Sequence, residues 1–135
     1  MLGEMIGELD GHVTSVRVEG TDTGPRLEVM LQQQGMVLGH GVSDITTYWN
    51  RMRPDGLFIG GANGMIFTAD AQGALYTGNG IGRMTGQGGA AEWRGSLIFQ
   101  TMSPKLAALN GILVLFEFSI DETGMSQHTK LWEWK

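Results

Sequence analysis

The chain contains no cysteine, which excludes disulfides, thiol nucleophiles and thiolate metal sites. Basic residues are also scarce: 9 Lys and Arg stand against 14 Asp and Glu, and they are scattered along the chain. A nucleic-acid surface needs clustered Lys and Arg to displace counterions from phosphates, so we expect no nucleic-acid partner. No apolar run reaches the roughly 18 residues of a membrane-spanning helix, so we expect no membrane partner either.

The first residues of the chain do not have the pattern of a signal peptide. Glu4 and Glu8 stand where such a peptide would have a basic segment followed by an apolar run. Together with the missing cysteines, this predicts a cytoplasmic protein. The length of 135 residues is typical of one domain, and the 41% hydrophobic content is enough for one core, so we expect a single domain over 1–135.

Proline is rare, with 3 residues, whereas glycine is abundant, with 22. The glycines stand between or inside short apolar runs that alternate with a period of two residues, which is typical of strands. Turn-forming clusters follow one another roughly every 8–12 residues, a spacing typical of a sandwich or a barrel. We count about eight strands, at 12–18, 27–31, 36–49, 57–68 (one strand or two), 74–81, 90–101, 113–120 and 125–134.

The glycines inside the strands favour a barrel over a sandwich. A glycine weakens a strand unless the chain must bend there, and such bends allow a small sheet to close on itself. Closure also removes the exposed edges of an apolar sheet. We therefore predict an all-β fold, a closed antiparallel barrel of about eight strands. One short helical connector is expected near 103–110, with Pro104 at its first position.

Apolar residues fall on both faces of the strand at 112–118. Val114 and Phe116 share one face, while Leu113 and Leu115 lie on the other, and Ile98 repeats the pattern in the strand before it. An apolar outer face indicates cover by another subunit or by the short helical connector. We favour the first interpretation and expect a homo-oligomer. In the last strand, Trp132 and Trp134 share a face, which we expect to be buried.

Three segments carry a resemblance to known proteins: TGQGGAAEWRGS at 85–96, SPKLAALNG at 103–111 and LWEW at 131–134. Together they resemble small bacterial and archaeal proteins of uncharacterised function whose barrels look like allene oxide cyclase and related calycin-like domains. The likeness spans about 35–135. It implies an eight-stranded barrel with a mainly apolar interior, often oligomeric. Some relatives are cyclases that enclose an apolar substrate, but no motif here aligns with their functional residues, so no catalytic residue is assigned.

Two groups of residues are candidates for binding a ligand. Tyr48, Trp49 and Arg51 precede a strong turn at 53–56 and would rim a barrel mouth, where a cation can hold a carboxylate. They would equally suit a solvated end of the barrel. We expect no metal site, because the three histidines lie far apart in the sequence, and no cofactor.

The second group is Glu92, Arg94 and Glu117, charged residues in the middle of apolar strands. If these side chains point inward, they could orient or polarise a ligand. If they point outward, they form surface or interfacial ion pairs, which is the interpretation we favour. Two functions follow from the sequence. The first is a barrel that binds an apolar small molecule, with cyclase or isomerase activity as an extension; the alternative is a non-catalytic, oligomeric interaction module with a side-chain-filled barrel.

Overall fold

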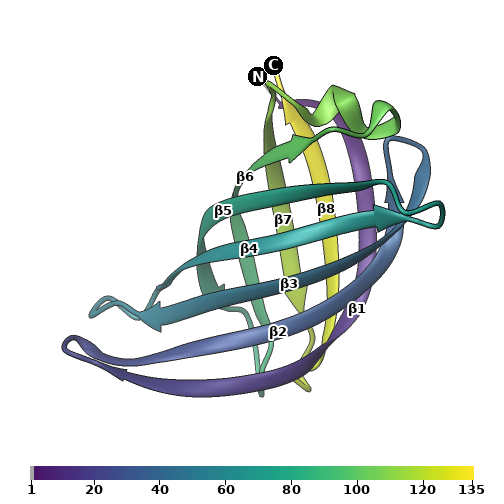
Figure 1. Cartoon of the computed structure of the whole chain (residues 1–135). Helices are drawn as coiled ribbons and strands as arrows, with labels where there is room; N and C mark the ends of the chain where they lie inside the picture. The colour runs from purple at the N-terminus through teal and green to yellow at the C-terminus, as the bar shows by residue number, and fades with distance from the viewer. Residues whose placement is uncertain (1) are drawn as a thin grey trace.

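The computed structural model describes residues 2–135 and shows a closed barrel of eight antiparallel strands (Figure 1). Each strand pairs with the next, and β1 pairs with β8. The predicted fold class is therefore confirmed. The elements are β1 (Leu2–Thr21), β2 (Gly24–Val37), β3 (His40–Met52), β4 (Phe58–Thr68), β5 (Gly73–Met84), β6 (Ala91–Thr101), the 3₁₀ helix η1 (Pro104–Leu109), β7 (Leu113–Ile120) and β8 (Ser126–Trp134).

The strands alternate between the interior and the outer face of the barrel. In β6, Trp93 and Leu97 are buried, whereas Arg94 and Ile98 between and beside them are exposed. Successive side chains of a strand point to opposite faces, so in a closed barrel every second residue enters the core. Within residues 2–135, no helix has the length and hydropathy to cross a membrane.

The predicted strand at 36–49 is two strands, β2 and β3, joined by a tight turn. Leu38 and Gly39 both have positive φ, at 51° and 79°, and Val37 pairs with His40. Two central residues with positive φ make the kind of two-residue turn that suits the right-handed twist of a hairpin. The prediction of one continuous strand over 36–49 is therefore wrong, because the chain reverses at this turn.

The barrel is strongly bent. Figure 1 shows β2, β3, β4 and β5 crossing the view at a steep angle to β6, β7 and β8. Strand β1 joins the two groups, because it pairs with β8 near its start and with β2 over most of its length. Its register against β2 shifts between Val13 and Ser15. Such a bulge kinks a strand and increases its twist, which lets β1 turn from one group to the other.

The predicted connector near 103–110 is confirmed as the 3₁₀ helix η1, which lies at the barrel end that also carries both termini (Figure 1). Its Leu106 and Leu109 are fully buried and join a core cluster with Val37 and Val114. The helix therefore closes one end of the barrel. The alternative that it covers the apolar outer face near Leu113 and Leu115 is wrong.

One glycine permits a close approach inside the barrel. Gly64 of β4 pairs with Thr46 of β3 on one side and with Tyr76 of β5 on the other. A Cβ atom at position 64 would overlap the Tyr76 ring. The missing side chain thus lets the Tyr76 ring lie across β4 and bring its hydroxyl to Thr46.

We expect Gly64→Ala to lower the free energy of unfolding by about 1–3 kcal/mol, because the added methyl group must displace the buried Tyr76 ring. Urea denaturation followed by fluorescence measures the change. Gly41→Ala is the matched control, since a Cβ atom there meets nothing within 4 Å. We expect it to change the free energy by less than about 0.5 kcal/mol. Equal effects of the two substitutions would contradict the role given to Gly64.

Candidate functional site

The interior of the barrel holds a buried carboxylate, Asp44 of β3, whose residue is only 1% exposed. Three side chains donate hydrogen bonds to it. Gln33 Nε2 lies 3.0 Å and Thr46 Oγ1 2.9 Å from Oδ2, and the Tyr76 hydroxyl lies 2.6 Å from Oδ1. A buried charge is tolerated in an apolar interior only when it is paired or fully hydrogen-bonded, and these three donors meet that need without a cation.

The hydrogen bonds continue across the barrel. Thr129 of β8 donates to Gln33 Oε1 at 2.7 Å, and the hydroxyls of Thr46 and Tyr76 are in direct contact. The network thus joins β2, β3, β5 and β8. Strand pairing explains part of this arrangement, because Gln33 and Asp44 are opposite each other in the β2–β3 register.

Burial raises the pKa of Asp44 above 3.8, and the hydrogen bonds from Tyr76, Gln33 and Thr46 partly oppose that rise. Desolvation disfavours the charged form, whereas donors favour it. The pKa of Tyr76 is raised well above 10.0, first by burial and then by the charge of Asp44. The Tyr76 hydroxyl therefore keeps its proton and acts as a donor.

A cavity of about 80 Å³ lies beside this network. Most of its surface is apolar, formed by aromatic and leucine side chains and by the backbone of β4 and β5. Gln33, Thr46, Tyr76 and Thr129 supply the polar side, whereas Asp44 lies behind them. The other lining residues are Leu31, Tyr48, Trp49, Gly60, Gly61, Ala62, Gly78, Asn79, Gly80, Trp93, Leu97, Phe116 and Phe118.

An aromatic cluster forms another part of the cavity wall. The Tyr48 ring meets Trp93 and Phe118 edge to face, with centroids 6.1 and 5.9 Å apart, and Phe58 stacks on Trp93 at 6.2 Å. Burial raises the pKa of Tyr48 to about 12. Edge-to-face and stacked ring pairs are favourable arrangements, so this cluster stabilises one wall of the cavity.

Of the first predicted group, only Tyr48 points into the barrel. Trp49 lies on the outer side, where its ring is 5.6 Å from the Arg26 guanidinium carbon, and it contributes to the cavity lining beside Gly61. Arg51 donates a hydrogen bond to Thr23 at 3.1 Å. The structure thus separates the three residues and places no cation at the polar side of the cavity.

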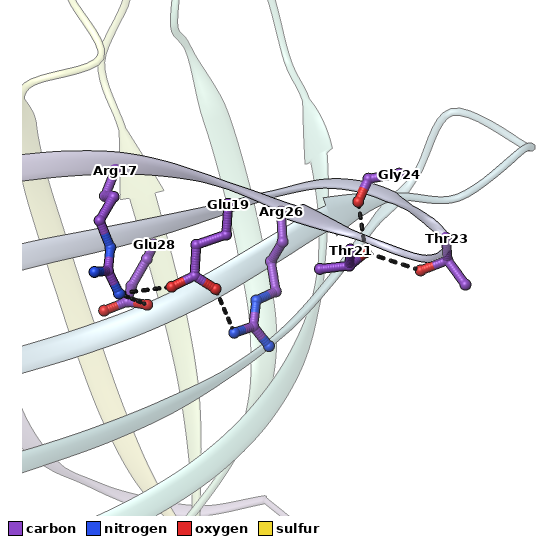
Figure 2. Close-up of polar contacts among 7 residues, drawn as sticks. All are labelled: Arg17, Glu19, Thr21, Thr23, Gly24, Arg26 and Glu28. Atoms are coloured by element: carbon purple, nitrogen blue, oxygen red, sulfur yellow. Dashed lines mark hydrogen bonds and ion pairs between the residues drawn. The ribbon is translucent and has the colours of Figure 1, made fainter.

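Arg26 belongs to a ladder of ion pairs on the hairpin of β1 and β2. Figure 2 shows the carboxylate of Glu19 between the guanidinium groups of Arg17 and Arg26. Both N–O distances are 2.6 Å, and Arg17 also pairs with Glu28 at 3.0 Å. The hydrogen bond from Arg26 lowers the pKa of Glu19. Four charges in one network order exposed side chains more than isolated pairs do, and they fix Arg26 over Trp49.

The second predicted group, Glu92, Arg94 and Glu117, lies on the outer face. Glu92 pairs with Arg83 at 2.5 Å, and Arg94 lies 3.9 Å from both Glu92 and Glu117. Of the two directions considered from the sequence, the structure shows the outward one, with the side chains in ion pairs. These residues form surface ion pairs outside the interior cavity.

The residues that sequence reasoning missed are Asp44 and its donors. A period of two along β3 puts Val42, Asp44, Thr46 and Tyr48 on one face, so the burial of Val42 is the signal that could have placed Asp44 inside. Gln33 and Thr129 have no such signal, because they follow from the pairing of distant strands. Within residues 2–135, no three His, Asp or Glu side chains are grouped as metal ligands.

Comparison with protein-family models finds no match, and neither does a search of curated proteins. Solved structures share the fold. A protein with unknown function from Clostridium acetobutylicum ATCC 824 has a TM-score of 0.81, 17% identity and 98% coverage of both chains. A conserved protein of unknown function from Rhodopseudomonas palustris has a TM-score of 0.79, with 14% identity and 99% coverage of both chains. A beta-barrel like protein from Acinetobacter baumannii AYE has a TM-score of 0.78 and 13% identity, and the match covers 99% of this chain and 96% of the Acinetobacter chain.

These neighbours support a small barrel fold, and none of their names gives an activity. At such identities, the likeness concerns the backbone alone and transfers no site residue. The resemblance to allene oxide cyclase and calycin-like barrels remains a prediction.

We expect Asp44→Asn to change how stability depends on pH. Because folding raises the pKa of Asp44 above 3.8, the folded protein keeps this proton over a range in which the unfolded chain has lost it. The wild-type free energy of unfolding therefore contains a contribution that falls as pH rises from 3.8 through the raised pKa. The variant lacks this group. Urea denaturation at successive pH values measures the free energy of unfolding of both proteins. The value for the variant minus the value for the wild type should rise across that pH window.

Asp121→Asn is a control for which the pH dependence of the free energy of unfolding should change in the opposite direction. The hydrogen bond from Thr123 lowers the pKa of Asp121 below 3.8, so its stabilising contribution is present above 3.8 and is lost as pH falls through the lowered pKa. For this substitution, the free energy of unfolding of the variant minus that of the wild type should fall as pH rises, and it should do so in a more acidic pH window. The same sign for both substitutions would contradict the assignment of Asp44 as the destabilised carboxylate.

Proposed function

We propose that the barrel interior binds a small, mainly apolar molecule that carries one hydrogen-bond donor. The observation behind this proposal is the direction of the hydrogen bonds beside the cavity. Tyr76 and Thr46 both donate to Asp44, and Thr129 donates to Gln33. Each hydroxyl has only one hydrogen, so each has only its lone pairs left for the cavity.

The hydroxyls of Thr46, Tyr76 and Thr129 therefore give the cavity an acceptor surface, with the carboxylate of Asp44 behind it. The donors that remain in the lining include the second N–H of Gln33 Nε2 and the Tyr48 hydroxyl. An alcohol, an amine or an amide N–H complements such a surface, while an anionic group would be repelled by Asp44. The carboxylate-bearing ligand considered from Arg51 is not supported, because Arg51 lies on the outer side and donates to Thr23.

The size of the cavity limits the ligand. A cavity of about 150 Å³ holds the six carbon atoms of benzene in a protein interior, so the 80 Å³ here suits about three to four non-hydrogen atoms. These atoms are either a whole small molecule or the end of a longer one. The leucine and aromatic lining supports an apolar body for this ligand.

Binding is better supported than catalysis. A general acid or base must reach the reacting atoms, and its pKa should lie near the working pH. Asp44 lies behind the lining side chains, and the pKa of Tyr76, which does line the cavity, is raised well above 10.0. Cyclase or isomerase activity would then come from confinement of a reactive conformer and not from proton transfer.

A barrel filled by its own side chains is the second candidate function, as a non-catalytic module. The observation that favours it is the completeness of the polar network, since Asp44 has three donors without any ligand. Native mass spectrometry of the freshly purified protein separates the two, because only a binding protein would retain an apolar molecule.

Three probes with four non-hydrogen atoms each test the binding proposal directly. 2-Propanol can donate a hydrogen bond, acetone can only accept, and acetate is an anion. For a ligand this small, we expect 2-propanol to bind with a Kd of roughly millimolar magnitude, and acetone and acetate at least about tenfold more weakly. NMR titration of the Trp93 indole and the methyl groups of Leu31 and Leu97 measures this.

Ala62→Leu is the matched control, because Ala62 lines the cavity and the larger side chain would fill it. The variant should keep the fold by circular dichroism and lose the response to 2-propanol. Equal binding of the three probes would refute the acceptor surface. A wild-type protein that responds to none of them, and that retains no molecule in native mass spectrometry, would favour the side-chain-filled barrel.

A further inference from the structure

The outer face over β6, β7, β8 and β1 carries two rows of paired residues, all of them apolar except Ser96. Strand pairing places Ile98, Leu113, Trp134 and Leu2 side by side in one row, and Ser96, Leu115, Trp132 and Met5 in the next. Trp134 is 52% exposed and Ile98 62% exposed. The expectation that Trp132 and Trp134 lie in the core is therefore wrong. They lie on the surface, on the face where Leu113 and Leu115 were expected to be covered.

A charged row borders these apolar rows. Arg94 of β6, Glu117 of β7, Lys130 of β8 and Glu8 of β1 are neighbours by strand pairing. Their signs alternate as plus, minus, plus, minus across the four strands. Among the ion pairs of the described residues, none includes Lys130, whereas Glu8 already pairs with His128 at 2.7 Å.

This pattern is complementary to itself. In a face-to-face pair of identical surfaces, the two-fold axis lies in the plane of contact. If that axis runs along the strands between β7 and β8, each β7 residue faces the β8 residue of its own row on the other copy. Glu117 then faces Lys130, and Arg94 of β6 faces Glu8 of β1. Every charge in the row meets its opposite.

The same axis matches the apolar rows. Leu113 would face Trp134 of the second copy, and Leu115 would face Trp132. Each contact occurs twice by symmetry, so four tryptophans lie near the centre of the interface. Large aromatic side chains in the centre of a surface carry much of the affinity of protein interfaces.

We propose that this face, formed by β6, β7, β8 and β1, binds a second copy of the chain as a two-fold symmetric dimer. A groove of about 450 Å³ on this face, lined by Leu2, Leu115 and Trp132 and reaching Arg94 and Glu117, gives room for the projecting side chains of the second copy. The alternating charges fix the register. The dimer leaves the interior cavity unchanged, so this inference is independent of the proposed ligand.

Another apolar part of the outer face has no alternating charges beside it. Ile45, Met65 and Leu75 are neighbours across β3, β4 and β5, and all three are exposed. The residues that flank this row by strand pairing are Gln32 and Gln100, which are neutral. This surface supplies a matched control for the dimer face.

A charge swap tests the dimer. The full chain should sediment at twice the monomer mass in a concentration series. Lys130→Glu places two acidic residues opposite each other at both symmetric positions, and it should raise the dimer Kd by about tenfold or more. Glu117→Lys should do the same. The double variant Glu117→Lys/Lys130→Glu restores opposite charges across the axis and should return the Kd to within about threefold of the wild-type value.

Two further variants complete the experiment. Ile98→Gln on the dimer face should weaken association, whereas Leu75→Gln on the opposite surface should leave the Kd unchanged. A chain that remains monomeric up to its solubility limit would overturn the proposal. So would single charge variants that dimerise as well as the wild type, a double variant that stays weakened, or a dimer that dissociates with Leu75→Gln and not with Ile98→Gln.

Discussion

The need to pair a buried carboxylate inside a closed sheet governs much of this structure. Asp44 has no cation beside it, so its charge depends on the amide of Gln33 and the hydroxyls of Thr46 and Tyr76. These groups come from three strands. A shift of one residue in the β2–β3 register would put Gln33 on the opposite face from Asp44, leaving a buried charge with a missing donor. The network therefore opposes register errors that apolar packing alone would tolerate.

The same network sets the size and character of the interior space. Tyr76 reaches Asp44 only because Gly64 has no side chain, and its ring then fills the space over β4. On one side, Leu106 and Leu109 of η1 close the barrel; on the other, the rings around Trp93 pack together. The cavity that remains between these two groups of side chains is therefore small. A barrel of this strand number can be packed solid or can admit one small ligand, and this one lies between those limits.

The strand order and the closure of the barrel followed from the sequence, but the direction of several side chains did not. Turn clusters and two-residue alternation are local signals, so the number of strands and the helical connector were predictable. In β3, however, Ile45 and Trp49 lie outside while Asp44 and Thr46 lie inside. In this strand, assigning the more hydrophobic residues to the interior predicts the wrong face. Asp44 finds its distant partners on β2 and β5, and Thr129 of β8 reaches Gln33 across 96 positions of sequence separation, which no local pattern contains.

An apolar outer face and a polar interior each cost free energy unless something compensates for them. Inside, the compensation for the Asp44 carboxylate comes from one chain, because Gln33, Thr46 and Tyr76 all donate to it. Outside, Trp134 and Ile98 remain in contact with water, and no segment of residues 2–135 covers them. Scattered exposed apolar residues are ordinary, but two adjacent rows on four neighbouring strands are a contiguous patch, which typically marks an interaction surface. Since the charges beside that patch alternate so as to match their own rotated image, a second copy of this chain satisfies both the apolar rows and the charged row at once.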